Sequence, residues 1–460
     1  MIIEPSQVKH SEMSTGDDVG RVFHWNGGIY RAINKNKVAD VKELFDCGLI
    51  PELIKADLIP DTKITQYTLG DSPMVLSHAT IKSVTYPFEW SFEMMKAAAL
   101  TILRVNEISM KYGYQTKDAH SFNVLFDGTH PYYIDIGSFT KVSKDTKHFI
   151  WYTEYLTQYP FMFYIAKTNE YHWVKQLSAS DMLITFEAYL LYRYKWLRRF
   201  DLKTARRVAK LWKFFNIGDA ISDDQIRQKK FGSILVLFRK MFGSGNKTIA
   251  DLKADLQKAK KKPNETMWGE YQSKFEESNT RFNRLIEIMS GHNIKTVFEV
   301  AANQGFFSNM LLTKAGVEHS YCTDYDDNAV DTMFLKYPDR RNLSPVLMNF
   351  LFQPQTSFTL PAPARFKSDL VVALAIMHHI ILTQGQSVDF FLTTLLKYSN
   401  KYILVEFMPI GLWNSESDKA PPVPDWYNVD WFRTHFVKYF KILHEEEVAK
   451  NRIAFFGEKI

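Results

Sequence analysis

Two short runs in the last third of the sequence combine residue types that could bind a nucleoside. An apolar run ends near Glu299 and enters a turn of small residues that contains Ala301, Asn303 and Gly305. Small side chains let the backbone approach a ligand closely, and such a turn often leads into a helix amino terminus. The next apolar run ends at Asp324, whose carboxylate could accept hydrogen bonds from both ribose hydroxyls. The three-glycine pattern of dinucleotide binding is absent, which disfavours a pyrophosphate ligand.

Three further apolar runs end in polar residues. Asn349 ends the first, where its side chain could meet the amino group of an adenine. His378 and His379 follow the second, and Glu406 lies near the end of the third. Ligands of parallel sheets bind at the carboxyl ends of the strands, and histidine is the side chain best suited to act as a base near neutral pH. We therefore expect His378, His379 and Glu406 to deprotonate or orient an acceptor.

A separate group of polar residues lies in the first third of the sequence. Asp118 precedes Asn123 by five residues, and Asp135 lies near the end of the predicted strand 132–136, in an Asp-Ile-Gly sequence. This order resembles phosphotransferases of the protein-kinase and aminoglycoside-kinase kind. In those enzymes the first Asp accepts the substrate hydroxyl proton, and the Asn and second Asp bind Mg²⁺ on the phosphates of ATP. The resemblance implies a kinase-like site, with Asn123 and Asp135 as Mg²⁺ ligands if that site is active.

Two features depart from the kinase pattern. Arg31 stands where the lysine of those families would be, and arginine is a rigid bidentate donor rather than a point charge. No glycine-rich phosphate loop precedes the predicted hairpin that carries it. We expect Glu43 or Glu52 to pair with Arg31. Two alternatives stay open: an active phosphotransferase that uses ATP and Mg²⁺, and a degenerate domain that binds the acceptor.

The elements that must position these residues follow from turn signals and periodicity. An Asn-Gly turn predicts a β-hairpin over residues 20–33, and a long helical pattern runs from Phe88 to Met110. Strands are expected at 63–69, 74–78, 123–126 and 132–136, and mostly helical sequence follows from 154 to 242. In the last third, strands separated by helices predict a parallel sheet. Those strands are expected at 296–300, 320–324, 346–349, 369–374 and 402–407.

Length and composition fit a two-domain globular protein. The chain has 460 residues, of which 46% are hydrophobic and 23% charged. We expect an α/β Rossmann-like domain over residues 266–460, preceded by an α+β kinase-like domain over residues 1–242. The latter would have a small lobe at about 15–82 and a helical lobe at about 83–242. Residues 243–265 are expected to form a linker with a short exposed helix.

The cysteines and the amino terminus favour the cytoplasm. Cys47 and Cys322 are the only cysteines, and their separation argues against a disulfide framework or a cysteine zinc site. No basic segment followed by an apolar stretch opens the chain. Residues 193–240 are rich in Arg, Lys and aromatic side chains, which suits solvated amphipathic helices, peripheral contact with an anionic inner membrane, or nucleic acid.

The motifs resemble those of class I S-adenosylmethionine-dependent methyltransferases, and more narrowly a bacterial family that includes nodulation-type and surface-polysaccharide-associated methyltransferases. The resemblance implies that Glu299, Gly305, Asp324 and Asn349 hold S-adenosylmethionine, and Ala301 departs from the glycine that many such enzymes have. It spans most of the chain. The segments that carry it are Tyr86–Ser91, Tyr133–Ser138, Glu299–Ser308, Leu370–His379 and Val405–Pro409.

The expected activity is transfer of a methyl group to an oxygen atom. No Asp/Asn-Pro-Pro-aromatic run follows the fourth predicted strand, and neither cysteine lies where a pyrimidine C5 nucleophile would be needed. The family resemblance alone implies a glycan or glycolipid precursor as acceptor, and hence a role in polysaccharide biosynthesis. The alternatives are a bifunctional kinase–methyltransferase of a glycan end, an RNA methyltransferase, and a non-catalytic interaction protein.

Overall fold

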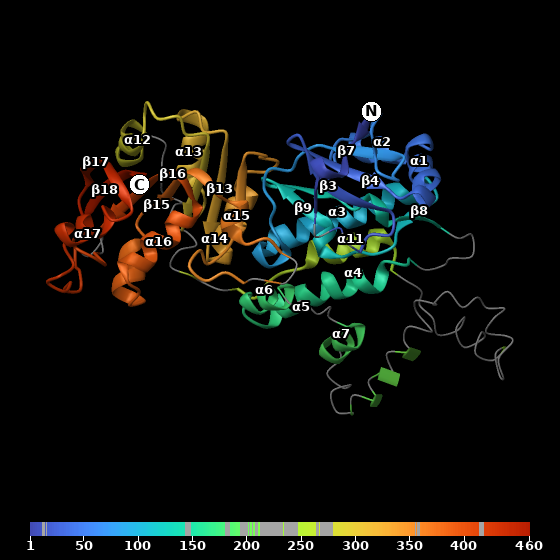
Figure 1. Cartoon of the computed structure of the whole chain (residues 1–460). Helices are drawn as coiled ribbons and strands as arrows, with labels where there is room; N and C mark the ends of the chain where they lie inside the picture. Colours follow the sequence, from blue (N-terminus) through green and yellow to red (C-terminus); the bar gives the residue numbers. More distant parts are fainter. Residues whose placement is uncertain are drawn as a thin grey trace.

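A computed structural model shows two domains packed side by side (Figure 1). The structure describes residues 1–11, 14, 16–142, 149–179, 185–193, 201, 203–204, 206–207, 210–211, 233, 247–263, 266, 279–354, 356, 359–413 and 418–460. Most of the basic segment 193–240 lies outside these residues. Within them, no helix is both long and apolar enough to cross a membrane.

A seven-stranded sheet forms the centre of the carboxy-terminal domain, in the order β14-β13-β12-β15-β16-β18-β17. The first five strands in this order are parallel, and β18 and β17 form an antiparallel hairpin at the far edge. The order of the parallel strands is that of the doubly wound Rossmann fold, so the Rossmann-like expectation is confirmed for this part of the chain. The strands are β12 Thr296–Val300, β13 His319–Asp324, β14 Leu343–Leu347, β15 Ser368–Ala373, β16 Ser399–Phe407, β17 Phe440–Ala449 and β18 Arg452–Lys459.

Alternate residues of each strand supply the two faces of this sheet. Val297 packs with α12 (Thr280–Ile288) and α13 (Phe306–Lys314) on one face. Phe298, the next residue, packs on the other face, which is covered by α15 (Ala362–Arg365), α16 (Val388–Tyr398) and α17 (Val429–Phe436). Because the parallel strands are buried on both faces, they appear in the sequence as continuous apolar runs. This is why their positions could be predicted.

The amino-terminal domain begins with a five-stranded antiparallel sheet in the order β2-β3-β4-β7-β5. The expected hairpin is confirmed as β3 and β4, but the strand expected at 63–69 is divided into β5 and β6. Two short helices, α1 and α2, follow β4. The elements are β1 Ile2–Ile3, β2 Lys9–His10, β3 Gly20–Trp25, β4 Gly28–Ile33, α1 Val38–Asp46, α2 Leu49–Lys55, β5 Thr62–Ile64, β6 Thr68–Leu69 and β7 Met74–His78.

The rest of this domain surrounds the long helix α3 (Phe92–Lys111), which supplies much of its apolar core. Short strand pairs β9–β10 and β8–β11 lie on one side of it and carry the loops of the second polar group. The remaining elements are β8 Tyr114–Thr116, β9 Val124–Asp127, β10 His130–Tyr133, β11 Phe139–Lys141, α4 Tyr152–Gln158, α5 Pro160–Thr168, α6 His172–Ser178, α7 Phe186–Arg193 and α11 Ile249–Lys258.

Helix α11 is not the exposed helix expected within the linker. Its residues Ile249, Leu252 and Leu256 are buried and belong to the core around α3. Three apolar residues at helical spacing form a stripe that must be covered, and the amino-terminal domain covers it. This segment therefore belongs to the amino-terminal domain, and the prediction of an exposed helix was wrong.

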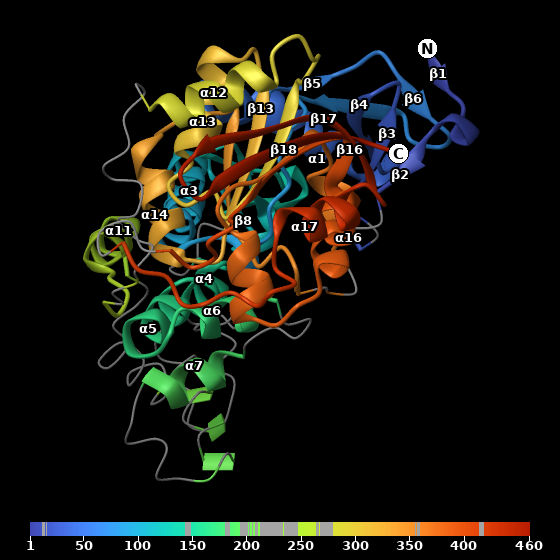
Figure 2. The same ribbon diagram turned by 90° about the vertical axis from the view of Figure 1, so that its left-hand side faces the viewer.

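The amino-terminal domain covers β14, the outermost parallel strand. Leu347 of β14 and Val330 of α14 (Asp327–Lys336) belong to the apolar core around α3. Two views at right angles show α3 and α6 beside this edge of the sheet (Figures 1 and 2). Because an uncovered edge strand exposes unpaired backbone groups, this contact both protects the edge and fixes the two domains to each other.

A buried ion pair holds the same junction. Arg365 of α15 donates from both terminal nitrogens to the carboxylate of Glu89, at 2.8 and 2.5 Å. Both side chains are less than 5% exposed. Arg365 also donates to the Val84 carbonyl and lies over the ring of Tyr86. The segment Tyr86–Ser91 thus contacts the carboxy-terminal domain through a bidentate, desolvated pair, whose geometry is among the strongest that side chains form.

Candidate cofactor site at the carboxyl edge of the parallel sheet

The turn after β12 has an unusual backbone. Ala301, Asn303 and Gly305 all have positive φ values, of 53°, 52° and 72°. For residues with a Cβ atom this left-handed region costs free energy and is maintained only where surrounding structure requires it. A Cβ atom on Gly305 would lie 3.0 Å from the Met333 sulfur, so glycine also allows α14 to pack closely. The turn brings backbone N–H groups to the edge of the sheet and begins helix α13.

Glu299 lies inside the sheet beneath this turn. Its carboxylate accepts hydrogen bonds from the Ser308 backbone N–H at 3.1 Å and the Ser308 hydroxyl at 2.5 Å. Burial raises the pKa of Glu299 to about 7, although these hydrogen bonds oppose the shift. Glu299 is 2% exposed. Its position suits a residue that fixes the turn, and a direct role in ligand binding stays a prediction.

Asp324, at the end of β13, has both carboxylate oxygens held by the backbone. One oxygen accepts the Asn303 N–H at 2.8 Å, and the other accepts the Asp326 N–H at 2.9 Å. Burial raises its pKa to about 6. Each carboxylate oxygen can accept two hydrogen bonds, so each retains capacity for one ribose hydroxyl. The turn that contains Asn303 and the acid that would bind the ribose are thus parts of one structure.

Asp326 extends this acidic edge and was not predicted. Its Oδ1 caps α14 by accepting the N–H groups of Asn328 and Ala329. Its Oδ2 is buried and has no hydrogen-bond partner among the described residues. An unsatisfied buried carboxylate oxygen is costly, which indicates an available acceptor position beside Asp324. The capping function could be predicted from sequence, but the free oxygen could not.

Asn349 lies after β14, but the oxygen of its side chain is already used. Oδ1 accepts the N–H of Leu351 at 3.0 Å and of Phe352 at 3.4 Å in a tight turn. The expected acceptance of an adenine amino group by this oxygen therefore competes with two backbone donors. The side-chain NH₂ group remains as a donor toward a ligand. Asn349 lies at this edge as expected, but its side chain would donate a hydrogen bond to a ligand rather than accept one.

His378 and His379 follow the carboxyl end of β15, as expected. Their rings lie 4.1 Å apart, and His379 starts a five-residue π-helix, His379–Thr383. π-Helices are rare and often occur at functional sites. Burial and the neighbouring His379 and Arg452 lower the pKa of His378 to about 3, and burial lowers that of His379. Both rings are therefore neutral at pH 7, and His379 is the more exposed of the two.

Glu406 is fully buried between two arginines. Its Oε2 accepts a hydrogen bond from Arg452 at 2.8 Å, and Oε1 lies 3.6 Å from the Arg281 side chain. Glu406 therefore contacts a guanidinium group with each of its oxygens. Glu406 is therefore engaged as an ion-pair partner, which disfavours the expected role as a base. Arg281 and Arg452 were not predicted, because only the tertiary fold brings them to β16.

The second polar group is also brought together. The Asn123 side chain donates to Asp118 at 2.6 Å, and Arg31 lies 3.8 Å from the Asp135 carboxylate. Burial raises the pKa of Asp135 to about 6, and Arg31 opposes the shift. Arg31 pairs most closely with Asp17, so the expected pairing with Glu43 or Glu52 was wrong. Glu43 pairs with Lys141 instead, because α1 directs it to the opposite side.

Asp17 lies in the loop between β2 and β3, which arches toward Arg31. Gly137 allows this approach, because a Cβ atom there would lie 2.9 Å from the Asp17 carboxylate. Asp18 is next to it and pairs with Lys37 and Lys117. The loop therefore presents the carboxylate of Asp17 to Arg31. This acidic loop is the feature that sequence reasoning missed.

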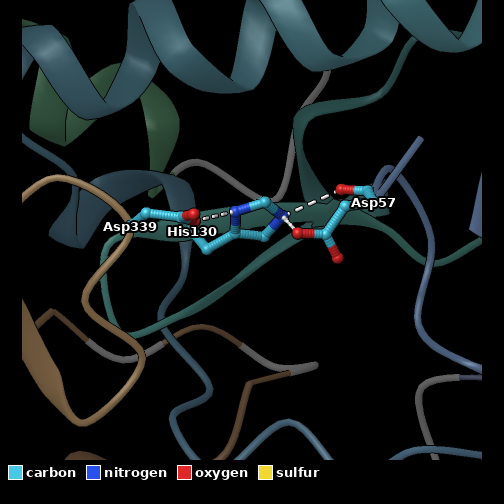
Figure 3. A group of neighbouring side chains, drawn as sticks. All are labelled: Asp57, His130 and Asp339. Atoms are coloured by element: carbon cyan, nitrogen blue, oxygen red, sulfur yellow. Dashed lines mark hydrogen bonds and ion pairs between the residues drawn. The ribbon is translucent and has the colours of Figure 1, made fainter. Parts of the chain in front are cut away.

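A third cluster joins the domains through Asp57, His130 and Asp339 (Figure 3). The two ring nitrogens of His130 face opposite partners: Nδ1 lies 2.6 Å from Asp339, and Nε2 lies 2.8 Å from the Asp57 carbonyl. Arg341 also contacts Asp57. Because the carboxylates lie at opposite edges of the imidazole, they do not converge with it on one ion position. We interpret this cluster as a polar bridge between the domains.

Comparisons with known proteins found similarity in sequence and in structure. No family model matches the chain. Nodulation protein NoeA of Rhizobium meliloti (strain 1021) is 24% identical over 441 residues, which cover 85% of this chain and 83% of NoeA. The sheet order defines a Rossmann-like class of domain, and NoeA is a relative that this chain resembles over most of its length.

Several solved methyltransferase structures are also similar. A SAM-dependent methyltransferase from Aquifex aeolicus is 16% identical and covers 43% of this chain and 100% of its own, with a TM-score of 0.33. The N-methyltransferase NodS from Bradyrhizobium japonicum WM9 with S-adenosyl-L-homocysteine is 11% identical and covers 39% and 85%, with a TM-score of 0.29. Magnesium protoporphyrin IX methyltransferase from Synechocystis PCC 6803 with bound SAM is 13% identical and covers 53% and 99%, with a TM-score of 0.30.

Proposed function

We propose that this protein is an S-adenosylmethionine-dependent methyltransferase whose methyl donor binds at the carboxyl edge of the parallel sheet. The observation that carries the proposal is Asp324, whose two oxygens are fixed by the backbone beside a left-handed turn. This arrangement fits a ribose diol and leaves no phosphate-binding glycine pattern for a dinucleotide. The bound donor supplies an electrophilic methyl group, and the protein aligns the acceptor with it.

Different residues of this edge bind different parts of the proposed ligand. Asp324 binds the ribose hydroxyls, and the turn that contains Ala301, Asn303 and Gly305 approaches the methionine part. Glu299 holds the turn through Ser308. Arg281 and Arg452 lie beside Glu406, and a guanidinium group suits the carboxylate that the methionine part carries together with its ammonium group. The donor set thus fits the cofactor.

Oxygen methylation requires a group that removes the hydroxyl proton. His379 is the better of the two histidines for this role, because it is neutral, half-buried and placed at the start of the π-helix. His378 is more deeply buried beside Arg452, which disfavours its protonated form. His379→Asn should therefore lower kcat by about 10²- to 10⁴-fold and leave donor affinity unchanged, as tested by steady-state kinetics.

A glycan or glycolipid precursor is the proposed acceptor, and polysaccharide biosynthesis is the proposed process. The similarity to a nodulation protein supports this class. The amino-terminal domain would bind the same acceptor, in the cytoplasm or at the inner face of the membrane. An RNA acceptor is the alternative, and it predicts affinity that falls steeply with salt, whereas a neutral glycan predicts little dependence.

We also propose that the amino-terminal domain is kinase-like. The convergence of Arg31, Asp118, Asn123 and Asp135 supports this, and it favours a second candidate function as a bifunctional kinase–methyltransferase. The acidic loop with Asp17 and Asp18 opposes phosphate binding and favours a degenerate, acceptor-binding domain. Titration with ATP and Mg²⁺ separates the two: binding that is lost in Asp135→Ala supports phosphotransfer, and no binding in the parent protein excludes it.

The central proposal is tested by calorimetry with S-adenosylhomocysteine. The parent protein should bind it in the micromolar range, and Asp324→Ala should lose detectable binding while retaining its thermal transition. Asp18→Ala is a matched control, because Asp18 is an exposed acid of the other domain. Absence of binding to the parent at millimolar ligand would overturn the proposed function.

A further inference from the structure

Lys175 of α6 reaches from the amino-terminal domain to the proposed cofactor edge. Its ammonium group donates to the carbonyl oxygen of Leu347, the last residue of β14, at 2.9 Å. The same group lies 5.8 Å from the ring centre of Tyr325, the residue after Asp324. Lys175 therefore stands between the loop after β13 and the loop after β14. Ligands of doubly wound sheets bind outside the carboxyl ends of the strands, which is where both loops lie.

The ammonium group has unused hydrogen-bonding capacity. It carries three N–H donors, and among the described residues the Leu347 carbonyl is its only hydrogen-bond acceptor. Burial lowers the pKa of Lys175 to about 8, while Glu89 and Asp327 oppose the shift through their charges. A partly buried cation with two unused N–H donors is stabilised by a further acceptor. Such a group is expected at a site that a ligand completes.

The position of Lys175 is fixed by the domain junction. Helix α6 packs on the short 3-10 turn Pro87–Glu89, whose Glu89 forms the buried pair with Arg365. Lys261 bridges Asp327 and Asp331 of α14 on the neighbouring part of the same junction. Lys175 is therefore held at a junction that ion pairs of both domains stabilise.

We propose that Lys175 donates a hydrogen bond to a ring nitrogen of the adenine of the methyl donor, so that the amino-terminal domain completes the cofactor site. Lysine is only a donor, so it can meet the acceptor nitrogens of adenine but not its amino group. The free Oδ2 of Asp326 supplies the complementary acceptor for that amino group. Tyr325, which is 68% exposed, offers its ring beside the base. This inference rests on the proposed function.

The expected consequence is that cofactor binding depends on both domains. A hydrogen bond to a charged donor contributes roughly 1.5–3 kcal/mol, which corresponds to about 10- to 100-fold in affinity. Lys175→Met retains the length of the side chain and removes the donor. It should lower the affinity for S-adenosylhomocysteine by that factor. Lys175→Arg, which retains a donor, should recover most of the lost affinity.

A set of modified ligands distinguishes direct contact from a general effect on folding. The full-length parent protein and Lys175→Met are titrated with S-adenosylhomocysteine and with its 1-deaza, 3-deaza and 7-deaza analogues, each of which lacks one ring nitrogen. One analogue should bind the parent about as weakly as Lys175→Met binds the unmodified ligand. That analogue should bind both proteins equally, because the two partners of one hydrogen bond have each been removed.

The control is Lys262→Met. Lys262 lies near the same junction but forms an exposed pair with Glu170, so its loss should leave all four affinities unchanged. Unchanged affinity in Lys175→Met would overturn the inference, as would an equal loss for all four ligands. Failure of the parent protein to bind S-adenosylhomocysteine is a different result, since it would refute the proposed function and this inference with it.

Discussion

The two polar sites of this protein use buried aspartates in opposite ways. Burial raises the pKa of Asp324 and of Asp135 to about 6 in each case. Backbone N–H groups hold both oxygens of Asp324. One oxygen of Asp135 also accepts a backbone N–H, that of Gly137, but this carboxylate faces the guanidinium of Arg31 and two other carboxylates, those of Asp17 and Asp118. A carboxylate that is held by the backbone keeps lone pairs for a neutral diol. A carboxylate that is held within a cluster of charges is largely committed to that cluster.

This difference explains why the proposals for the two domains differ in strength. The edge of the parallel sheet presents acceptors and donors that suit one neutral nucleoside. The amino-terminal site brings Asp118, Asn123 and Asp135 together near Arg31, whose closest carboxylate is that of Asp17. The junction between the domains then becomes important, because it lets the amino-terminal domain contribute to the first site through Lys175.

The largest expected effect concerns this junction. Arg365→Met leaves the carboxylate of Glu89 buried without its partner, so the free energy of unfolding should fall by about 3–5 kcal/mol. Chemical denaturation measures this change. The double variant Arg365→Met/Glu89→Leu should recover most of it, because it removes the unpaired charge.

Arg284→Met is the control for that experiment. Arg284 pairs with Glu287 and Glu446 on an exposed surface, where such pairs contribute at most about 1 kcal/mol. If Arg365→Met were no more destabilising than Arg284→Met, the two domains would not be held together by this pair. The dependence of cofactor binding on the amino-terminal domain would then lose its structural basis.

A smaller effect is expected for the ribose contact. Asp324→Asn retains the shape of the side chain but replaces one acceptor oxygen by an NH₂ donor. That donor would face a backbone N–H, of either Asn303 or Asp326, and could no longer accept a hydrogen bond from one ribose hydroxyl. S-adenosylhomocysteine affinity should fall by on the order of 100-fold. Calorimetry measures it, and Asp135→Asn should leave it unchanged because Asp135 belongs to the other site.

The expectations from sequence succeeded where the signal is local. The strand β12 follows from a largely apolar run, which is how buried parallel strands appear, and the acid at the end of β13 follows from the short strand-like sequence Ser320–Asp324. The hairpin of β17 and β18 was not predicted, because β17 lies at the sheet edge and carries the polar run His444–Glu447. An edge strand needs no continuous apolar pattern.

The partners of the site residues were harder to predict. Asp17 reaches Arg31 from a loop, and Lys175 reaches Leu347 across a domain junction. Neither contact has a periodicity or a fixed spacing, since both depend on how elements pack. The same holds for Arg452, which reaches Glu406 only because β18 pairs with β16. Sequence thus predicts which residues end a strand better than it predicts what they contact.

The pKa of Asp324 predicts that the affinity for S-adenosylhomocysteine falls by about tenfold for each pH unit below pH 6. Asp324 must be ionised to accept two hydroxyl hydrogens, and its pKa in the free protein is about 6. Below pH 6 the free protein carries the proton, and ligand binding must release it, so affinity for S-adenosylhomocysteine should fall as the pH decreases. Glu299, with a pKa of about 7, titrates nearby and would contribute to the profile.

Measuring affinity from pH 5 to pH 8 in the parent and in Asp324→Asn separates these contributions. The variant should lose the dependence below pH 6 and keep whatever Glu299 contributes near pH 7. An identical pH profile in both proteins would show that Asp324 is not the group that binds the ribose.

The smallest expected effect concerns the amino-terminal site and its affinity for ATP with Mg²⁺. If the acidic loop is what closes the amino-terminal site, then Asp17→Asn should relieve its repulsion of phosphates and improve the binding of ATP with Mg²⁺ by a few-fold, because one nearby charge has been removed. Lys37→Ala, which leaves Asp17 in place and removes one of the two lysines that pair with Asp18, should weaken nucleotide binding or leave it unchanged. Fluorescence titration with a labelled ATP analogue measures both variants. Should Asp17→Asn bind no better than the parent, the loop would not be the barrier, and the replacement of lysine by Arg31 would become the reason that this site departs from a phosphotransferase.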